Sequence, residues 1–281
     1  MKCPCCQSSE SKIQEYSRSH NICTNCGLIF IKRHSPRSAI IKYFEQIDPK
    51  GEVSESKQAF FDYALRRLDT QRGTSNSLLD IGCGIGDFLR KAQKRGWQPY
   101  GVEISKELSD VAARRLCGVR VFNGSVEEAA FKENTFSVIT IWDTLFHMER
   151  PYRDLEECYR ILKDNGTIGI RIRNAFFQKN IDSLYLRFGK IAEKLNLKKP
   201  SVFHEFCFSK KAIKLMLKRV GFRQVTILNS PLSAGDPYNH SQWALLIKAV
   251  KVTIYMVSQV IFTFSSGRWT IGPSLLIWAK K

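Results

Sequence analysis

The sequence predicts an α/β protein in which a central sheet of mostly parallel strands carries helices on both faces. Three observations support this fold class. Short apolar runs recur about every 20 to 35 residues, with helical patterns between them, as in strands joined by crossover helices. The first run of the series leads directly into a glycine-rich turn. The chain has 281 residues, enough for one such domain with small appendages.

Seven segments are expected to form the strands of this sheet. They are residues 77–81, 99–104, 119–122, 137–142, 166–173, 223–229 and 274–279. Before the first strand, residues 54–72 show the periodicity of an amphipathic helix, with Phe60, Ala64 and Leu68 on one side. We expect this helix to cover the ligand site at the end of the first strand.

The glycine-rich turn after the first strand indicates a cofactor site. Gly82, Gly84 and Gly86 occupy alternate positions, and without a Cβ they let the backbone approach a ligand closely. The dinucleotide pattern G-x-G-x-x-G would require a glycine where the chain has Asp87. Acids at Asp80 and Asp87 would repel a pyrophosphate, so they favour a cofactor that is cationic here. S-adenosylmethionine, with its ammonium and sulfonium groups, fits this turn better than NAD.

An acid at the end of the second strand supports the same cofactor. Glu103 follows Asp80 by 23 residues, close to the offset at which an acid meets ribose hydroxyls in such folds. One carboxylate can accept hydrogen bonds from both hydroxyls. The alternative is a solvated residue at a strand end, which the glycine-rich turn upstream disfavours.

The chain resembles the class I S-adenosylmethionine-dependent methyltransferases from about residue 55 to residue 230 and again at 274–279. Beside the glycine-rich turn, the resemblance rests on FSVITIWD at 136–143, LFHMERP at 145–151 and CYRILKDNG at 158–166. It implies a Rossmann-like sheet of seven strands, the last of them antiparallel. The chain departs from the family at Phe146, where relatives often carry Glu, which leaves a carboxylate role at this step without a residue.

The resemblance also implies which residues bind the cofactor. Ser125 and Val126 are placed in the loop that meets adenine, and Trp142 and Asp143 at the methionine end. The full expected set is Asp80, Gly82, Gly84, Gly86, Glu103, Ile104, Ser125, Val126, Trp142 and Asp143.

Two histidines are candidates for work on the methyl acceptor. His147 lies just beyond the fourth strand and could act as a base toward an acceptor hydroxyl. Its alternative is a structural histidine bonded to a backbone carbonyl. His204 resembles a family position on a lid at 175–210 and is expected to contact substrate, as Asn174 is after the fifth strand.

Two C-x-x-C pairs near the N-terminus predict a metal site. Cys3 and Cys6 form the first pair, and Cys23 and Cys26 follow 16 residues later. Four thiolates at this spacing can close a tetrahedral zinc site that is structural, because no position is left for water. Cys5 remains an alternative to Cys3 or Cys6.

The same pattern suggests the domain organisation. Residues 1–34 are expected to form a zinc-ribbon-like segment, 35–53 a linker and 54–281 the methyltransferase domain. Several bacterial methyltransferases that act on sugars, glycans and metabolites look similar, with a ribbon before the catalytic domain. No signal peptide precedes the first cysteine, so we expect a reducing, cytoplasmic location that disfavours disulfides.

Positive charge is concentrated in the second half of the chain. The net charge is +18, and residues 151–281 hold 22 basic and 8 acidic side chains. The densest part is 179–223, with 12 basic and 3 acidic residues. An excess of this size indicates an anionic partner, which could be nucleic acid, an acidic lipid surface or a phosphorylated substrate.

Residues 243–264 form a long apolar helical pattern with two interpretations. Lys248, Lys251, Ser258 and Gln259 fall near one side of the helix. The lysines argue against a bilayer span, since each costs about 2.5–3.5 kcal/mol at its centre. The helix either packs on the protein's own sheet or lies in a membrane interface, which would make the protein peripheral at the inner face of an anionic membrane.

The expected activity is methyl transfer from S-adenosylmethionine to an oxygen of a small-molecule, sugar or lipid-linked glycan acceptor that is anionic. The alternative is an RNA methyltransferase acting on ribosomal RNA, since a zinc ribbon and a basic surface fit that class too. The basic stretch lacks the interleaved aromatic residues on which single-stranded bases stack, so nucleic acid is the weaker candidate.

Overall fold

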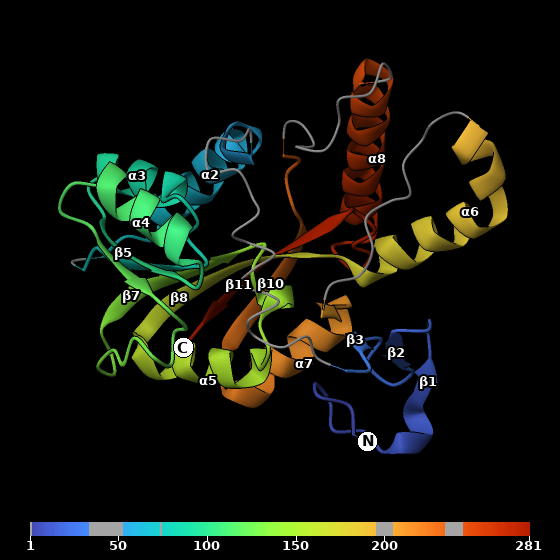
Figure 1. The fold of residues 1–281 in the computed structure, drawn as a ribbon, viewed down its shortest axis with the longest axis horizontal. Helices are drawn as coiled ribbons and strands as arrows, with labels where there is room; N and C mark the ends of the chain where they lie inside the picture. The colour runs from blue at the N-terminus through green and yellow to red at the C-terminus, as the bar shows by residue number, and fades with distance from the viewer. Residues whose placement is uncertain (1, 34–52, 74, 195–204, 234–243) are drawn as a thin grey trace.

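The computed structural model describes residues 2–33, 53–73, 75–194, 205–233 and 244–281. A large sheet lies at the centre, helices cover both of its faces, and a smaller sheet is attached at one side (Figure 1). The predicted linker at 35–53 falls almost entirely outside the described residues. Part of the predicted lid, including His204, also lies outside them.

The large sheet has seven strands. They are β4 (Ser77–Ile81), β5 (Gln98–Glu103), β6 (Arg120–Asn123), β7 (Phe136–Trp142), β8 (Leu162–Arg173), β10 (Arg223–Asn229) and β11 (Ser274–Lys280). Their spatial order is β10-β11-β8-β7-β4-β5-β6. β11 is antiparallel to both neighbours, and the other neighbouring pairs are parallel. This arrangement confirms the predicted α/β fold with its antiparallel last strand.

The strand ends agree with the sequence-based expectation to within one residue, apart from the start of β8. That strand begins at Leu162, four residues before the predicted start. The chain turns inside this extension, where Asn165 takes a positive φ of 60° and the β7–β8 pairing shifts register between Phe136 and Val138. The predicted turn is therefore present but is built into an irregular strand start.

Helices cover the two faces of the sheet unequally. They are α2 (Val53–Asp69), α3 (Asp87–Lys94), α4 (Lys106–Arg115), η2 (Leu145–His147), α5 (Pro151–Ile161), α6 (Ala175–Lys194), α7 (Lys210–Val220) and α8 (Ala244–Phe264). α5 and α7 lie on one face and α2, α3 and α4 on the other (Figure 1). Their apolar side chains fill two separate core clusters, one on each face. Ser105 and Ser209 cap α4 and α7 by accepting hydrogen bonds from the backbone N–H three residues on.

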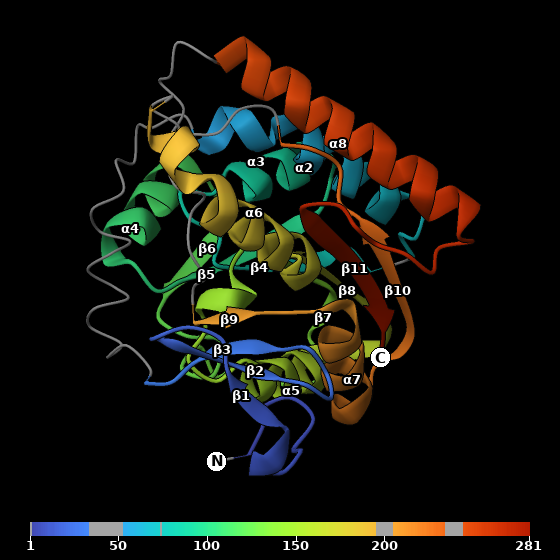
Figure 2. The ribbon, with the colours of Figure 1, turned by 90° about the vertical axis from the view of Figure 1, so that its right-hand side faces the viewer.

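The N-terminal sheet takes one of its strands from the part of the chain that forms the large sheet. After the short η1 (Glu10–Lys12), it is built from β1 (Ile13–Glu15), β2 (His20–Cys23), β3 (Ile29–Ile31) and β9 (Phe206–Cys207), in that order. β9 lies between α6 and α7 in sequence and pairs with β3 antiparallel (Figure 2). A bridge between Asn174 and Phe208 then connects this region to the end of β8. The N-terminal segment is thus joined to the rest of the chain through a shared sheet.

Candidate active site

The turn between β4 and α3 has the open geometry expected of a ligand-binding loop. Gly84 has a φ of 54°, and a Cβ built on it would meet no protein atom within 4 Å. Gly82 differs, because its Cβ would lie 2.3 Å from Oγ1 of Thr144 in the loop after β7. Gly82 therefore allows two loops to pack together, while Gly84 faces space that a ligand can occupy.

Glu103, at the end of β5, is bonded to this turn. One carboxylate oxygen accepts from the N–H of Gly84 at 2.8 Å, and the other accepts from the N–H of Ser105 at 3.0 Å. The side chain is 5% exposed, and burial raises its pKa. Each oxygen keeps a lone pair, so Glu103 can still accept from two ligand hydroxyls beside the open face of Gly84.

Asp80 supplies a second buried carboxyl group at the end of β4. It is 3% exposed and accepts a hydrogen bond from Oγ1 of Thr140 at 2.6 Å. Burial raises the pKa of Asp80 to about 7. A cation placed next to this group would favour its ionised form.

The third predicted acid, Asp143, lies in an ion-pair cluster that the sequence did not indicate. Its Oδ2 lies 3.0 Å from Nζ of Lys57 on α2 and 3.3 Å from Nη1 of Arg171 on β8. Burial alone would raise the pKa of Asp143, but the charges of Arg171 and Lys57 lower it to about 2. Asp143 also has a φ of 56°, which turns the chain sharply at the end of β7.

Two arginines on β8 add positive charge at this edge of the sheet. The Arg171 guanidinium is buried above the ring of Phe60, 4.5 Å from its centre, and its Nε has no hydrogen-bond partner. The Arg173 guanidinium lies 5.9 Å from the centre of the Phe146 ring. Their alternation with isoleucine at 170–173, at the end of the buried part of β8, was a signal in the sequence, since basic residues seldom interrupt a buried strand without a partner.

His147 lies in the 3₁₀ turn η2, shortly after the end of β7. Its backbone N–H donates to the carbonyl of Thr144 at 2.9 Å, and its ring centre lies 4.5 Å from that of Phe146. The side chain is half-buried. The Phe146 ring therefore contacts both the His147 ring and the Arg173 guanidinium.

The other predicted cofactor residues are placed around the loops of β5, β6 and β7. Trp142 is buried, packing edge-to-face on Phe60 with ring centres 5.1 Å apart. Val126 is buried in the core. The hydroxyl and the backbone N–H of Ser125 both donate to Glu128, which leaves no N–H at this position for a ligand.

Ile104 and Asn174 lie at the ends of β5 and β8. Ile104 is half-buried, and its carbonyl accepts from Nδ2 of Asn123 at 3.1 Å. Asn174 is 1% exposed, and its amide is bonded to backbone groups on both sides. The side-chain amide of Asn174 is used to hold the backbone, so it is not available for the contact with substrate that the sequence led us to expect.

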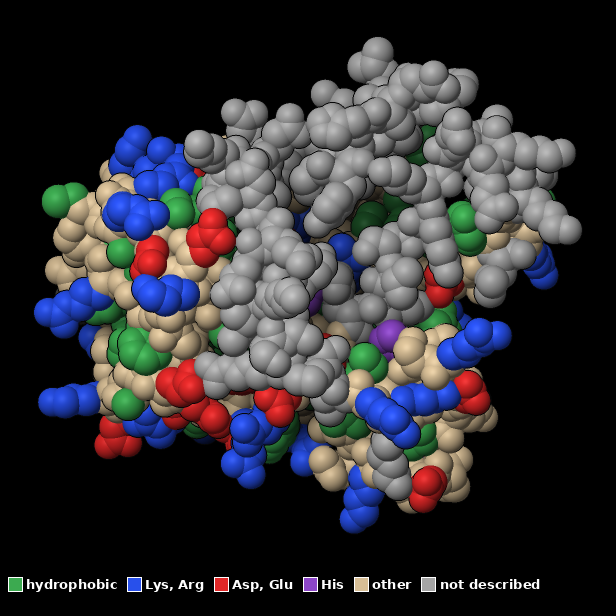
Figure 3. All heavy atoms as spheres, viewed as in Figure 1, with side chains coloured by type: hydrophobic (Ala, Val, Ile, Leu, Met, Phe, Trp, Pro, Cys, Tyr) green, Lys and Arg blue, Asp and Glu red, His purple; other side chains and the backbone are tan. Residues whose placement is uncertain are grey.

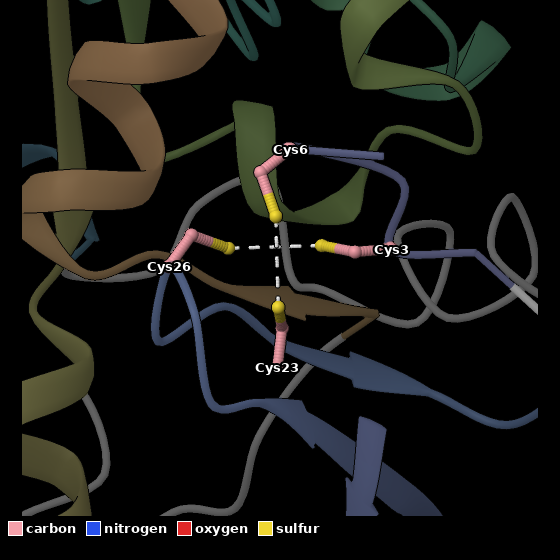
Figure 4. A group of neighbouring side chains, drawn as sticks. All are labelled: Cys3, Cys6, Cys23 and Cys26. Atoms are coloured by element: carbon pink, nitrogen blue, oxygen red, sulfur yellow. Dashed lines mark hydrogen bonds between the residues drawn. The ribbon is translucent and has the colours of Figure 1, made fainter. Parts of the chain in front are cut away.

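The four cysteines of the two C-x-x-C pairs converge on one point. Their sulfur atoms all lie within 4.8 Å of one another, and the Cys3–Cys26 and Cys6–Cys23 separations are both 3.6 Å (Figure 4). A tetrahedral zinc site with Zn–S bonds of about 2.3 Å has sulfur atoms about 3.8 Å apart, so this set fits the ion. Cys5 points elsewhere, since its thiol donates to the carbonyl of Ala212 on α7 at 3.0 Å.

Comparison with known proteins identifies the fold and its chemistry. Residues 53–227 match a family model described as a methyltransferase domain. An uncharacterized protein of Methanocaldococcus jannaschii is 31% identical over 187 residues, which are 66% of this chain and 80% of that protein. A demethylmenaquinone methyltransferase of a Geobacillus species is 29% identical over 112 residues, and the chain spans only 47% of its length.

Solved structures show the same fold. An S-adenosylmethionine-dependent methyltransferase of Mesorhizobium loti aligns with a TM-score of 0.52 and 13% identity, over 80% of this chain and all of that one. A phosphoethanolamine N-methyltransferase of Haemonchus contortus, solved with S-adenosylmethionine, gives a TM-score of 0.55 and 16% identity, over 96% of this chain and 70% of that one. The family match over residues 53–227 shows that the chain belongs to the methyltransferase domain family, and with its fold and open glycine turn it is a class I S-adenosylmethionine-dependent methyltransferase.

Proposed function

We propose that the protein methylates a hydroxyl of an anionic acceptor, which is a small molecule, a sugar or a lipid-linked glycan. The observation that carries this proposal is the charge at the carboxyl ends of β7 and β8. Lys57, Arg171 and Arg173 place positive charge around the carboxylate of Asp143, and each of the three lowers its pKa. In open α/β sheets ligands bind outside the carboxyl ends of the strands, so an acceptor that brings negative charge would complete this cluster.

S-adenosylmethionine would be held by the residues around the β4 and β5 ends. When bound it supplies an electrophilic methyl group on a sulfonium. We propose that Glu103 accepts hydrogen bonds from the ribose hydroxyls and that Asp80 and Asp143 face the cationic methionine end. The cofactor would lie against the open face of Gly84. Ile104, Ser125 and Val126 bordering the adenine, and Trp142 at the methionine end, stay predictions.

The main role of the protein is then to align the acceptor with the methyl group and to exclude water from it. Such positioning can lower a barrier by about 7–11 kcal/mol. We assign His147 the role of the base that takes the proton from the acceptor hydroxyl, because its ring lies beside the Phe146–Arg173 pair. His204 lies outside the described residues, so its contact with substrate remains a prediction.

Cofactor affinity is expected to rise with pH between 6 and 7. Below its pKa of about 7 the buried carboxyl of Asp80 is mostly neutral, and it gains charge as the pH rises. A cationic ligand binds the ionised form better, so the Kd should fall about fivefold from pH 6 to pH 7. Isothermal titration of the protein and of Asp80→Asn at both pH values is the measurement. The variant should bind more weakly with little pH dependence; an equal pH dependence in both proteins would remove Asp80 from this role.

The small-molecule class is favoured over RNA by two observations. Several curated relatives are named demethylmenaquinone methyltransferases, after a small-molecule acceptor. On the face shown in Figure 3, the Lys and Arg side chains of the described residues lie in separate groups interspersed with acidic ones. The described part of this face therefore shows no continuous basic groove of the kind that tracks a nucleic-acid backbone.

The test of the acceptor class uses S-adenosylmethionine with a labelled methyl group. The full chain is incubated with separate metabolite, lipid and RNA fractions of a bacterial extract, and the labelled product is passed over an anion exchanger. We expect label in a retained small-molecule or lipid product. Arg173→Gln should lower kcat/KM about 10- to 100-fold, because a charge-assisted hydrogen bond is lost. Arg120→Gln, an exposed change on β6, should leave it unchanged. Label in RNA, or equal rates for both variants, would contradict the proposal.

We also propose that Cys3, Cys6, Cys23 and Cys26 bind one structural zinc ion. The support is the convergence of four sulfur atoms at tetrahedral separations, with Cys5 turned toward α7. A site closed by four protein ligands has no open position for catalysis, so the role is to hold the N-terminal sheet together.

A further inference from the structure

Exposed apolar side chains are concentrated on two helices. The described part of the chain has eleven large apolar side chains that are exposed, and ten of them lie on α6, on α8 or just after α8. The ten are Phe176, Leu184, Phe188, Val250, Val252, Met256, Val257, Val260, Phe264 and Trp269. The remaining one, Phe122, is on β6. Single exposed apolar residues are common, but such a concentration marks a contact surface.

α8 has its apolar side turned outward. Val252, Met256 and Val260 recur at helical spacing and are 44%, 58% and 51% exposed. Ser258 is fully buried, and its carbonyl accepts from Nδ2 of Asn229 at 2.9 Å. None of the exposed α8 side chains within the described residues is charged, and Lys251 is half-buried. This is the reverse of a helix whose outer face meets water.

α6 combines an apolar ridge with positive charge. Phe176, Leu184 and Phe188 are separated by multiples of four residues, so they line one side of the helix, and each is more than half exposed. Lys179 and Arg187 are exposed three residues after Phe176 and Leu184, and each lies next to that ridge residue on the helix surface. Apolar side chains flanked by cations suit the boundary between lipid tails and phosphate headgroups.

Asn174 joins the start of α6 to the segment that follows α8, at the end of β8. Its Nδ2 donates to the carbonyls of Thr270 at 2.9 Å and Gly272 at 2.8 Å, in the segment after α8. Its Oδ1 accepts from the N–H of Phe176 at the start of α6, at 3.1 Å. Both helices extend from the same side of the molecule (Figures 1 and 2). The start of α6 and the segment after α8 are therefore both bonded to the end of β8, next to Arg173.

We propose that the exposed faces of α6 and α8 form a docking surface for a membrane that contains anionic lipids. No helix within the described residues is long and apolar enough to cross a bilayer, so the surface would rest in the interface. Charge favours lipid over a second copy of the chain, because a symmetric pairing through α6 would bring Lys179 and Arg187 of both copies together. Lipid phosphates instead neutralise them. The proposal does not depend on the identity of the acceptor.

The test is co-sedimentation of the full chain with vesicles. We expect binding to vesicles of phosphatidylcholine with phosphatidylglycerol, weaker binding to phosphatidylcholine alone, and a decrease with salt. Lys179→Gln with Arg187→Gln should lower the partition coefficient about fivefold for each charge. Met256→Ser with Val260→Ser should lower it about tenfold through lost insertion, at low and at high salt. These side chains are exposed, so circular dichroism should show an unchanged fold.

Two matched controls on β6 separate the surface from general effects. Phe122→Ser removes the exposed apolar side chain that lies elsewhere, and Arg120→Gln removes an exposed charge at the far edge of the sheet. Neither should change the partition coefficient more than twofold. The proposal is overturned if no vesicle retains the protein at low salt, or if the controls weaken binding as much as the docking-surface variants. It is equally overturned if light scattering shows a dimer that the Met256–Val260 variant dissociates while vesicle binding is absent.

Discussion

Replacing Gly84 with valine is expected to abolish binding of S-adenosylmethionine and leave the fold intact. The Cβ of residue 84 points into space that no protein atom occupies within 4 Å, so the added side chain would fill ligand space without a clash in the protein. We expect the Kd measured by isothermal titration to rise more than a hundredfold, with S-adenosylhomocysteine affected equally. Affinity within threefold of the unmodified protein would mean that the turn does not hold the cofactor.

Gly118→Val is the matched control for this variant. Gly118 also has a positive φ, of 73°, and a Cβ there would likewise meet nothing within 4 Å. Both substitutions therefore carry the same backbone strain of about 1–2 kcal/mol. Gly118 lies between α4 and β6 and is not part of the turn, so its variant should lose similar thermal stability and keep cofactor binding. Gly82→Ala would be a poor choice, because its Cβ would collide with Thr144.

Loss of the metal site is expected to produce the second large effect. Cys23→Ser should lower the metal content from about one zinc per chain to nearly none, and it should open the N-terminal sheet. Structural zinc in small domains binds with an apparent free energy of about 10–16 kcal/mol, far more than a sheet of such short strands supplies. Elemental analysis and hydrogen exchange followed by mass spectrometry are the measurements. Exchange should accelerate in β1 to β3 and in β9, which pairs with β3, and little in β4 or β7.

Two other cysteines serve as controls for the metal site. Cys117 is exposed and belongs to no cluster, so Cys117→Ser should change neither metal content nor exchange. Cys5→Ser should keep the zinc, because the Cys5 thiol bonds Ala212 on α7. Loss of zinc in Cys5→Ser, or full zinc in Cys23→Ser, would overturn the assignment of ligands.

Local sequence patterns predicted the large sheet well, because its strands carry local signals. Buried apolar runs such as Leu78–Ile81 identify a strand from composition alone, and a turn of alternate glycines after it identifies the ligand site. The spacing of the cysteine pairs predicted their convergence. Spacing could not decide between Cys5 and its neighbours, because the choice depends on a contact with Ala212 that lies far along the chain.

Features that depend on distant segments could not be predicted in the same way. Lys57, Asp143 and Arg171 come from three separate elements and meet only through the fold. β9 is two residues long, too short for any periodicity, and it exists because β3 offers an edge. For α8 the sequence shows that one side is apolar, but only the packing of Ser258 against Asn229 shows that this side faces outward.

The shared strand β9 has a consequence for how the protein is made. β3 leaves the ribosome early, and its partner Phe206–Cys207 follows only after most of the catalytic domain. Until then the edge of β3 has unpaired N–H and C=O groups, the kind of edge that pairs with other chains. In a nascent chain whose four cysteines have already bound zinc, this edge would stay in a fixed, folded form until β9 has been synthesised. Folding during translation would then depend on the zinc supply. Zinc limitation would cause nascent chains to aggregate to a greater extent than it would inactivate enzyme that has already folded.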